Sequence, residues 1–161
     1  MTFVLDAGPA ERGLESTVID VRSDPVVLLR PGAVTAAEIA AVVGYDPARP
    51  SSSSSDATPV SPGQLSSHYA PAAAIRLNAV RAHDGEALLA FGPSVPAHDG
   101  PVINLSPEGD LTEAAAHLFS ALRALDATGA STIAVMAIPD TGLGEAINDR
   151  LRRAAAPRDG S

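Results

Sequence analysis

Lysine, cysteine and tryptophan are all absent from this chain of 161 residues. Without cysteine the chain can form no disulfide, no thiolate metal site and no thiol nucleophile. All eleven basic residues are therefore arginines, and the formal net charge is −8. Because an acidic surface repels phosphate backbones, we expect no direct nucleic-acid binding in a broad groove, and any bound anion must be held by a few placed groups.

Aromatic residues and long apolar runs are also scarce. Aromatics make up 3% of the chain and hydrophobic residues 45%, so any core must be built from Ala, Val, Leu and Ile. No apolar run approaches the ~20 residues of a membrane span, and the first residues do not read as a signal peptide. His83, His98 and His117 are scattered without ligand spacing, so we expect no metal site. The composition favours a soluble, cytoplasmic protein without a membrane partner.

Two β-branched runs near the start of the chain predict a β-hairpin. They cover Thr17–Arg22 and Pro25–Arg30, after a shorter strand-like run at Thr2–Leu5. Only Ser23 and Asp24 separate the two runs, so we expect a tight turn between paired strands.

A short helix is expected after the hairpin. Thr35 and Glu38 have the spacing of a capping box, and Gly44 suits the end of the helix. Three short strands and one short helix bury too little apolar surface to be stable alone. We therefore expect residues 1–45 to be the tail of a larger sheet domain, or to dock on a partner.

Residues 46–71 are rich in proline and include five consecutive serines, Ser51–Ser55. A stretch of this length without secondary structure is typical of an interdomain linker or a functional lid. Its second half carries His68 and Tyr69. The tyrosine ring can stack on a base while its hydroxyl reaches a phosphate, or Tyr69 simply fixes the linker to a domain.

Residues 72–156 predict a second, compact unit, followed by a frayed tail at residues 157–161. Strands are expected at Ala73–Leu77, Ala87–Phe91, Val102–Leu105 and Ser131–Ile138. Asp110, with Glu113 at the capping-box position, begins a helix with one apolar face, and a final amphipathic helix follows Gly142. Strands that alternate with helices indicate a small parallel α/β domain, in which the nearly unbroken apolar run of the fourth strand lies centrally.

Three places offer groups that can bind an anion, and each also has a purely structural interpretation. Glu15-Ser16-Thr17, where a loop enters a strand, can hold a carboxylate or phosphate, or its hydroxyls can bond the local backbone. Arg30 at a strand end can bind phosphate through two N–H groups, or remain solvated. The turn Gly142–Glu145 can present helix amides to a phosphate, but the charge of Glu145 favours simple helix capping.

Four segments in a fixed order carry a family resemblance: DAGPAERGLESTVID, LLRPGAVT, SPGQLSSHYAP and AIPDTGLGEAINDRLRRAA. Together they resemble the two-domain L-threonylcarbamoyladenylate synthases, over nearly all of the chain except the serine run and the tail. The resemblance implies an α/β fold with an incomplete, twisted YrdC-like sheet domain at residues 1–45, a linker or lid at residues 46–71, and a small parallel Rossmann-like domain at residues 72–156.

The resemblance also implies a function. The family condenses L-threonine, bicarbonate and ATP into threonylcarbamoyl-AMP and pyrophosphate, for the threonylcarbamoyladenosine modification of tRNA. Ser16, with Thr17 beside it, would contact threonine or nucleotide, and Arg30 would bind nucleotide phosphate. Tyr69 would close over the nucleotide, while Glu15 and His68 are weaker candidates. No catalytic residue is assigned, and Mg²⁺ is expected to accompany ATP with ligands outside this chain.

The sequence also departs from the family pattern. The long N-terminal portion of the catalytic domain, with its basic residues, has no counterpart here. We therefore expect this fragment to be inactive alone and to need the missing half as a partner. Ser66 and Ser67 stand where family members often carry basic residues, which makes the lid less cationic. Two other hypotheses stay open: a stand-alone nucleotide- or partner-binding module, and a purely structural domain.

Overall fold

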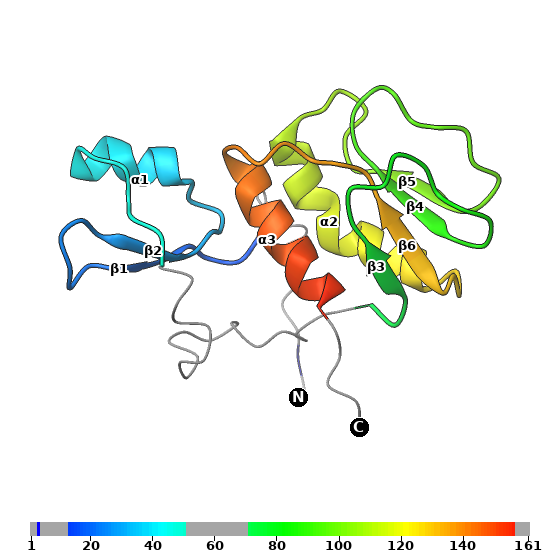
Figure 1. The fold of residues 1–161 in the computed structure, drawn as a ribbon, viewed down its shortest axis with the longest axis horizontal. Coiled ribbons are helices and arrows are strands. Elements are labelled where there is room, and N and C mark those ends of the chain that lie inside the picture. Colours follow the sequence, from blue (N-terminus) through cyan, green and yellow to red (C-terminus); the bar gives the residue numbers. More distant parts are fainter. Residues whose placement is uncertain (1–2, 4–12, 51–70, 157–161) are drawn as a thin grey trace.

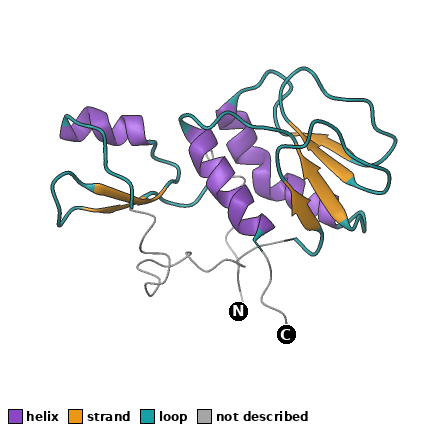
Figure 2. Cartoon of the chain, in the orientation of Figure 1, coloured by secondary structure: helices purple, strands orange, loops and turns teal. Residues whose placement is uncertain are grey.

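The computed structural model of the protein describes residues 3, 13–50 and 71–156. Residues 13–50 form a small assembly of two strands and one helix, here called the hairpin unit (Figure 1). Residues 71–156 form a larger assembly of four strands and two helices, here called the sheet unit (Figure 2). The expected strand at Thr2–Leu5 and the expected tail at residues 157–161 lie outside the described residues.

The expected hairpin is confirmed, but the prediction of a tight turn at Ser23 and Asp24 is wrong. Strands β1 (Val18–Asp20) and β2 (Val27–Arg30) are antiparallel, and Asp20 pairs with Val27, so that Val21–Val26 form a longer loop. The chain turns immediately after β1 because a carboxylate oxygen of Asp20 accepts a hydrogen bond from the Arg22 backbone N–H at 3.0 Å. Hydrogen bonds from Arg22 also lower the pKa of Asp20 to about 2. Pro25 has no N–H to donate to a strand ladder, which delays the start of β2.

Helix α1 (Ala36–Val43) has the cap that the sequence predicts. The Thr35 hydroxyl accepts from the Glu38 N–H at 3.2 Å, and the Glu38 carboxylate accepts from the Thr35 N–H at 2.7 Å. Gly44 ends the helix in the left-handed region, at φ 86°. The core of the hairpin unit is small and contains Val26, Leu28 and Ile39, with Ala36 and Val43 packed against them.

The segment after α1 returns to the hairpin. The Leu28 N–H donates to the Ala48 carbonyl at 2.9 Å, and the Ala48 N–H donates to the Val26 carbonyl at 2.8 Å. The first residues of the stretch expected to be a linker are therefore held against β2. The serine run itself lies outside the described residues.

The sheet unit contains a fully parallel, four-stranded sheet, as the sequence predicts. Its order is β3 (Ala74–Arg76), β6 (Thr132–Val135), β4 (Ala87–Ala90) and β5 (Val102–Asn104). The expected apolar central strand is β6, which pairs with both β3 and β4. Helices α2 (Leu111–Asp126) and α3 (Leu143–Ala155) pack on one face of this sheet (Figure 2).

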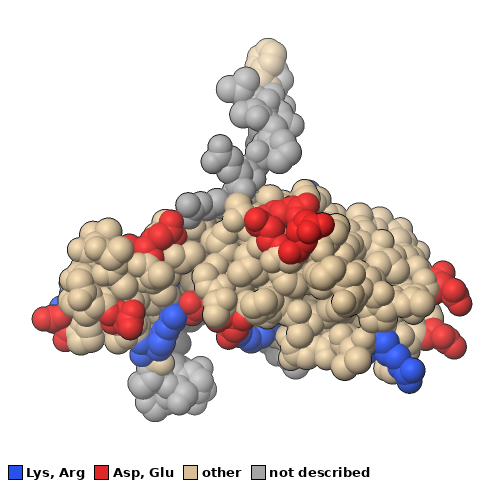
Figure 3. All heavy atoms as spheres, turned by 90° about the horizontal axis from the view of Figure 1, so that it is seen from above, with Lys and Arg blue, Asp and Glu red and all other residues tan. Residues whose placement is uncertain are grey.

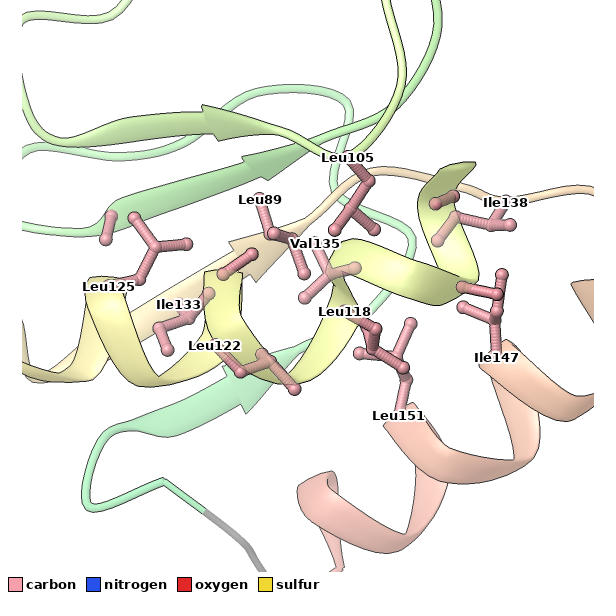
Figure 4. Packing of buried hydrophobic residues seen from close by; sticks show 14 of the residues in the cluster. Leu89, Leu105, Leu118, Leu122, Leu125, Ile133, Val135, Ile138, Ile147 and Leu151 are labelled. Atoms are coloured by element: carbon pink, nitrogen blue, oxygen red, sulfur yellow. The ribbon is translucent and has the colours of Figure 1, made fainter. Parts of the chain in front are cut away.

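The main core lies between the sheet and these two helices (Figure 4). Strand β4 is buried on both faces: Leu89 faces the helices, and Leu88 packs with Ala134 in a smaller cluster on the other face. Leu118 of α2 is fully buried in the main cluster. The helical spacing of the apolar residues in α2 therefore corresponds to its buried face.

Asp110 caps the N-terminus of helix α2, as expected, but the prediction that Glu113 bonds back to the Asp110 N–H is wrong. Asp110 accepts from the N–H groups of Thr112 and Glu113, at 2.6 and 2.9 Å. The Asp110 N–H, however, donates to the Ser106 hydroxyl oxygen at 2.9 Å, and this hydroxyl donates to the Glu113 carboxylate. The fully buried Ser106 therefore lies between the two groups that a direct capping box would join. No helix in the described ranges is both long enough and apolar enough to cross a membrane.

Candidate functional site

The Glu15–Thr17 segment lies against the backbone that follows Arg30. The Ala33 N–H donates to the Glu15 carbonyl at 2.9 Å. The Thr17 hydroxyl accepts from the Val34 N–H at 3.0 Å and donates to the Val34 carbonyl at 2.5 Å. Thr17 thus uses its hydroxyl to fasten two backbone segments, which is the structural alternative considered for this residue.

Gly32 allows the two segments to cross. A Cβ atom on this residue would lie 2.4 Å from the Glu15 carbonyl oxygen and 2.5 Å from the Thr17 nitrogen. Both contacts are to backbone, so the neighbours have no flexible side chain to move aside. The glycine of the Arg-Pro-Gly corner is therefore a steric requirement for this crossing.

Arg30 reaches back to Ser16, so the structure brings two of the sequence-derived candidates together. Its Nη2 donates to the Ser16 carbonyl at 2.9 Å and to the Ser16 hydroxyl at 3.3 Å, and its Nε donates to the same carbonyl at 3.2 Å. Ser16 is exposed and Arg30 is half-buried. A guanidinium beside an exposed hydroxyl suits the oxygen atoms of a phosphate or carboxylate.

A narrow crevice separates this corner from helix α3. Its lining residues are Leu14, Glu15, Arg30, Pro31, Gly32, Ala146, Asp149, Arg150 and Arg153. The Glu15 carboxylate pairs with Arg150 across the crevice at 3.0 Å. The Arg150 guanidinium also lies over the Phe119 ring, 4.9 Å from its centroid. Sequence reasoning missed the contribution of α3, for which the basic end of this helix was the available signal.

The remaining candidates are dispersed or fall outside the description. His68 and Tyr69 lie in residues that the structure does not describe. At the start of α3, the Glu145 carboxylate accepts from Arg49 Nη2 at 2.9 Å, so a negative charge lies near the helix N-terminus. The rings of His98 and His117 contact backbone carbonyl oxygens. Within residues 13–50 and 71–156, no cluster of three acidic or histidine side chains is placed to hold a metal ion.

Basic side chains are sparse on the face of the molecule in Figure 3. The arginines visible there stand apart from one another, and acidic side chains form a separate patch on the larger unit. The formal net charge of the chain is −8, so an anion held near Arg30 is bound by local geometry rather than by a broad positive field.

A family model described as "Threonylcarbamoyl-AMP synthase, C-terminal domain" matches residues 34–156. The chain belongs to this family. The match begins at Val34, before α1, and so extends across the boundary expected at residue 45; the expected domain boundaries stay a prediction. The chain is 32% identical to the threonylcarbamoyl-AMP synthases of Bacillus subtilis and of Pyrococcus abyssi, over 96% of its own length and 49% of theirs. It thus spans about half the length of these curated relatives.

Solved structures of the same family share the fold. The P. abyssi Sua5 protein complexed with L-threonine superposes with a TM-score of 0.75 at 31% identity, over 93% of this chain and 48% of that one. A variant of P. abyssi Sua5, in which an adjacent histidine and tyrosine are both changed to alanine, gives a TM-score of 0.68 at 27% identity, over 90% of this chain and 46% of that one. These structures support a mixed α/β fold with a parallel four-stranded sheet for this member of the threonylcarbamoyl-AMP synthase family.

Proposed function

We propose that this chain is part of a threonylcarbamoyl-AMP synthase. The complete enzyme would join L-threonine, bicarbonate and ATP into threonylcarbamoyl-AMP and pyrophosphate, and its product would serve the modification of tRNA adenosine in the cytoplasm. Family membership and the order of the four sequence segments support this function. The proposal concerns the whole enzyme, because the chain spans about half of its relatives.

The contact between Arg30 and Ser16 carries the proposal. These residues come from two separate segments of the resemblance, and the guanidinium lies 2.9 Å from the Ser16 carbonyl oxygen. In this arrangement Arg30 binds a phosphate of the nucleotide, and the Ser16 hydroxyl contacts nucleotide or threonine. The Thr17 hydroxyl bonds the backbone of Val34, and Thr17 stays a candidate, beside Ser16, for contact with threonine or nucleotide.

The chemistry explains why a guanidinium is useful at this place. Threonine and bicarbonate condense to a carbamate with loss of water, and a carbamate oxygen then forms a bond to the α-phosphorus of ATP while pyrophosphate leaves. Negative charge grows on phosphate oxygens during this displacement, and a fixed cation stabilises that charge. Mg²⁺ would arrive with ATP as part of the substrate. Among the described residues no acidic cluster is placed to receive it, so no step is assigned to the metal here.

The proposed lid comes from the segment between the two units. His68 and Tyr69 form an adjacent histidine–tyrosine pair, like the pair replaced by alanine in the P. abyssi variant. We assign Tyr69 to closure over the nucleotide, with His68 beside it. Exclusion of water by a lid would protect the acyl adenylate from hydrolysis.

The finer architecture follows from the same proposal. The hairpin unit would be the end of a twisted YrdC-like sheet domain, and the sheet unit would be a Rossmann-like accessory domain. L-threonine is the proposed amino acid substrate, because the similar P. abyssi protein is complexed with L-threonine.

A chimeric enzyme tests the function. Residues 1–161 are placed behind the half of the B. subtilis relative that they do not match, and pyrophosphate release is measured. We expect release only when L-threonine, bicarbonate and ATP are all present. Arg30→Ala should abolish most of this release, whereas Arg22→Ala, on the same hairpin but paired only with Asp20 in the hydrogen bonds seen, should not. A chimera that unfolds cooperatively yet releases no pyrophosphate would contradict the proposal.

A binding module without catalysis would give a different result in ATP-binding measurements. Under that alternative, residues 1–161 alone would bind ATP tightly in a calorimeter, and threonine would not change the affinity. Under the proposed function, the isolated chain binds ATP weakly and its affinity rises in the chimera.

A further inference from the structure

Helix α3 contacts the hairpin unit through an ion pair whose arginine is buried. Arg150 Nη1 lies 3.0 Å from the Glu15 carboxylate, with the arginine side chain 8% exposed and the glutamate side chain 36% exposed. The Phe119 ring, contributed by α2, supports the same guanidinium at 4.9 Å. An aromatic face and an acidic partner together fix the position of a buried guanidinium.

A second ion pair joins the same two bodies with the opposite polarity. Here the hairpin unit supplies the arginine, Arg49, and α3 supplies the acid, Glu145, with 2.9 Å between Nη2 and the carboxylate. The hairpin-unit residues of the two ion pairs lie at opposite ends of its sequence: Glu15 precedes β1 and Arg49 follows α1. Because the charges alternate along α3, only one direction of docking pairs both of them.

Close backbone packing accompanies the ion pairs. Gly13 lies so near α2 that a Cβ atom would be 2.5 Å from the Ala115 carbonyl oxygen. Leu14 packs against the main core of the sheet unit. The segment that leads into Ser16 is therefore anchored on the sheet unit before it reaches the hairpin.

We propose that α3 positions Ser16 and Arg30 through two reciprocal ion pairs, Arg150 with Glu15 and Glu145 with Arg49. Ser16 and Arg30 together are called the Ser16–Arg30 wall of the candidate site. Glu15 directly precedes Ser16, and Ser16 accepts hydrogen bonds from Arg30, so an anchor at Glu15 restrains the whole wall. Arg150 is thus a positioning residue that acts through Glu15. This gives the sheet unit a role in the reaction, and the inference rests on the proposed function for its consequence in catalysis.

The docking itself is tested on the chain without any substrate. The sequence has no cysteine, so the exposed positions Val42 in α1 and Ala124 in α2 can be changed to cysteine and spin-labelled specifically. Electron–electron double resonance then measures the distance distribution between the two units. We expect a single narrow distribution in the otherwise unchanged chain. Arg150→Gln and Glu15→Gln should each broaden it.

Two controls separate positioning from loss of folding. Glu15→Gln removes the pair from the hairpin side and leaves the core of the sheet unit intact. Arg152→Gln removes a neighbouring arginine of α3 whose partner, Asp140, belongs to the sheet unit, and should leave the distribution narrow. At the Arg49–Glu145 ion pair, Arg49→Glu should broaden the distance distribution, and the double variant Arg49→Glu with Glu145→Arg should restore the narrow distribution.

The same variants in the chimeric enzyme supply the kinetic readout. Positioning predicts that Arg150→Gln and Glu15→Gln lower kcat/KM by a similar factor, that the double variant is no worse than either, and that Arg152→Gln has no effect. An unchanged distance distribution in both Arg150→Gln and Glu15→Gln would overturn the inference, as would equal broadening by Arg152→Gln. A distribution that broadens as expected, in a chimera without synthase activity, would instead refute the proposed function and leave the docking role standing.

Discussion

Replacement of Gly32 by alanine tests the crossing of the two segments that form the candidate site. The added Cβ would lie 2.4 Å from the Glu15 carbonyl oxygen, 2.5 Å from the Thr17 nitrogen and 2.6 Å from the Ser16 carbonyl carbon. Since all three atoms belong to backbone, the segments must move apart. Overpacking of this kind costs about 1–3 kcal/mol, and loss of the Ala33–Glu15 hydrogen bond adds about 1 kcal/mol. We therefore expect Gly32→Ala to destabilise the hairpin unit by about 2–4 kcal/mol.

Amide hydrogen exchange of Ala33 and Val34 measures this loss directly, because both amides donate across the crossing. Gly44→Ala is the matched control. Gly44 has φ 86° but no atom within 4 Å of its Cβ position, so alanine there adds only backbone strain of about 1–2 kcal/mol at the end of α1. Unchanged exchange of the Ala33 amide in Gly32→Ala would contradict the steric role of Gly32. Equal acceleration of that exchange by Gly44→Ala would contradict it as well.

Four further predictions follow from individual contacts. Leu118→Ala should destabilise the sheet unit by about 2–5 kcal/mol in chemical denaturation, because Leu118 is fully buried; an effect below this range would contradict its central place. Thr35→Ala should destabilise α1 by about 1 kcal/mol, with faster exchange of the Glu38 amide as the readout. Hydrogen bonds from Arg76 lower the pKa of Glu86 from 4.5 to about 2, so its contribution to stability is present above pH 4.5 and lost as the pH falls through 2; Glu86→Gln should flatten the acid unfolding curve in this window. In the chimera, Arg30→Ala should weaken ATP binding by about 1.5–3 kcal/mol in calorimetry, and an unchanged affinity would refute its role as a phosphate ligand.

Helix α1 shows what the sequence predicts well. Its N-cap, its capping glutamate and its terminal glycine lie within ten positions of one another, and each signal depends only on neighbouring backbone. The two central parallel strands, β4 and β6, were predictable for a related reason, since their apolar character reflects burial on both faces. The strand order, with β6 inserted between β3 and β4, is a property of the whole chain and carries no local signal.

The errors in prediction also have identifiable physical causes. The hairpin turn was expected at Ser23 and Asp24, but β1 already ends at Asp20. The Asp20 side chain accepts a hydrogen bond from the Arg22 N–H, and this local turn, which competes with strand pairing, was not recognised in the sequence. The Asp110–Glu113 box was incomplete because Ser106, from the preceding loop, occupies the space between them. In both cases a short polar side chain formed a local hydrogen bond that the apolar pattern does not reveal.

The candidate site was only partly predictable. Ser16 and Arg30 were identified by their motifs, and the structure brings them together. Arg150 was not identified, because its partner Glu15 lies far away in the sequence and the contact exists only after the two units pack. The sequence thus indicates Ser16 and Arg30, whereas the contact of α3 with this part of the site is seen only in the tertiary structure.

Incorporation of ¹³C-labelled bicarbonate into an adenylate tests the proposed synthase activity. The chimeric enzyme is incubated with labelled bicarbonate, ATP and L-threonine, and the products are separated for mass spectrometry. We expect an adenylate that contains both threonine and the labelled carbon. It should disappear when threonine is omitted and lose most of its yield when Arg30 is replaced by alanine. A folded chimera that forms no such adenylate, or forms it equally well with Arg30→Ala, would contradict the proposed function and the role of Arg30.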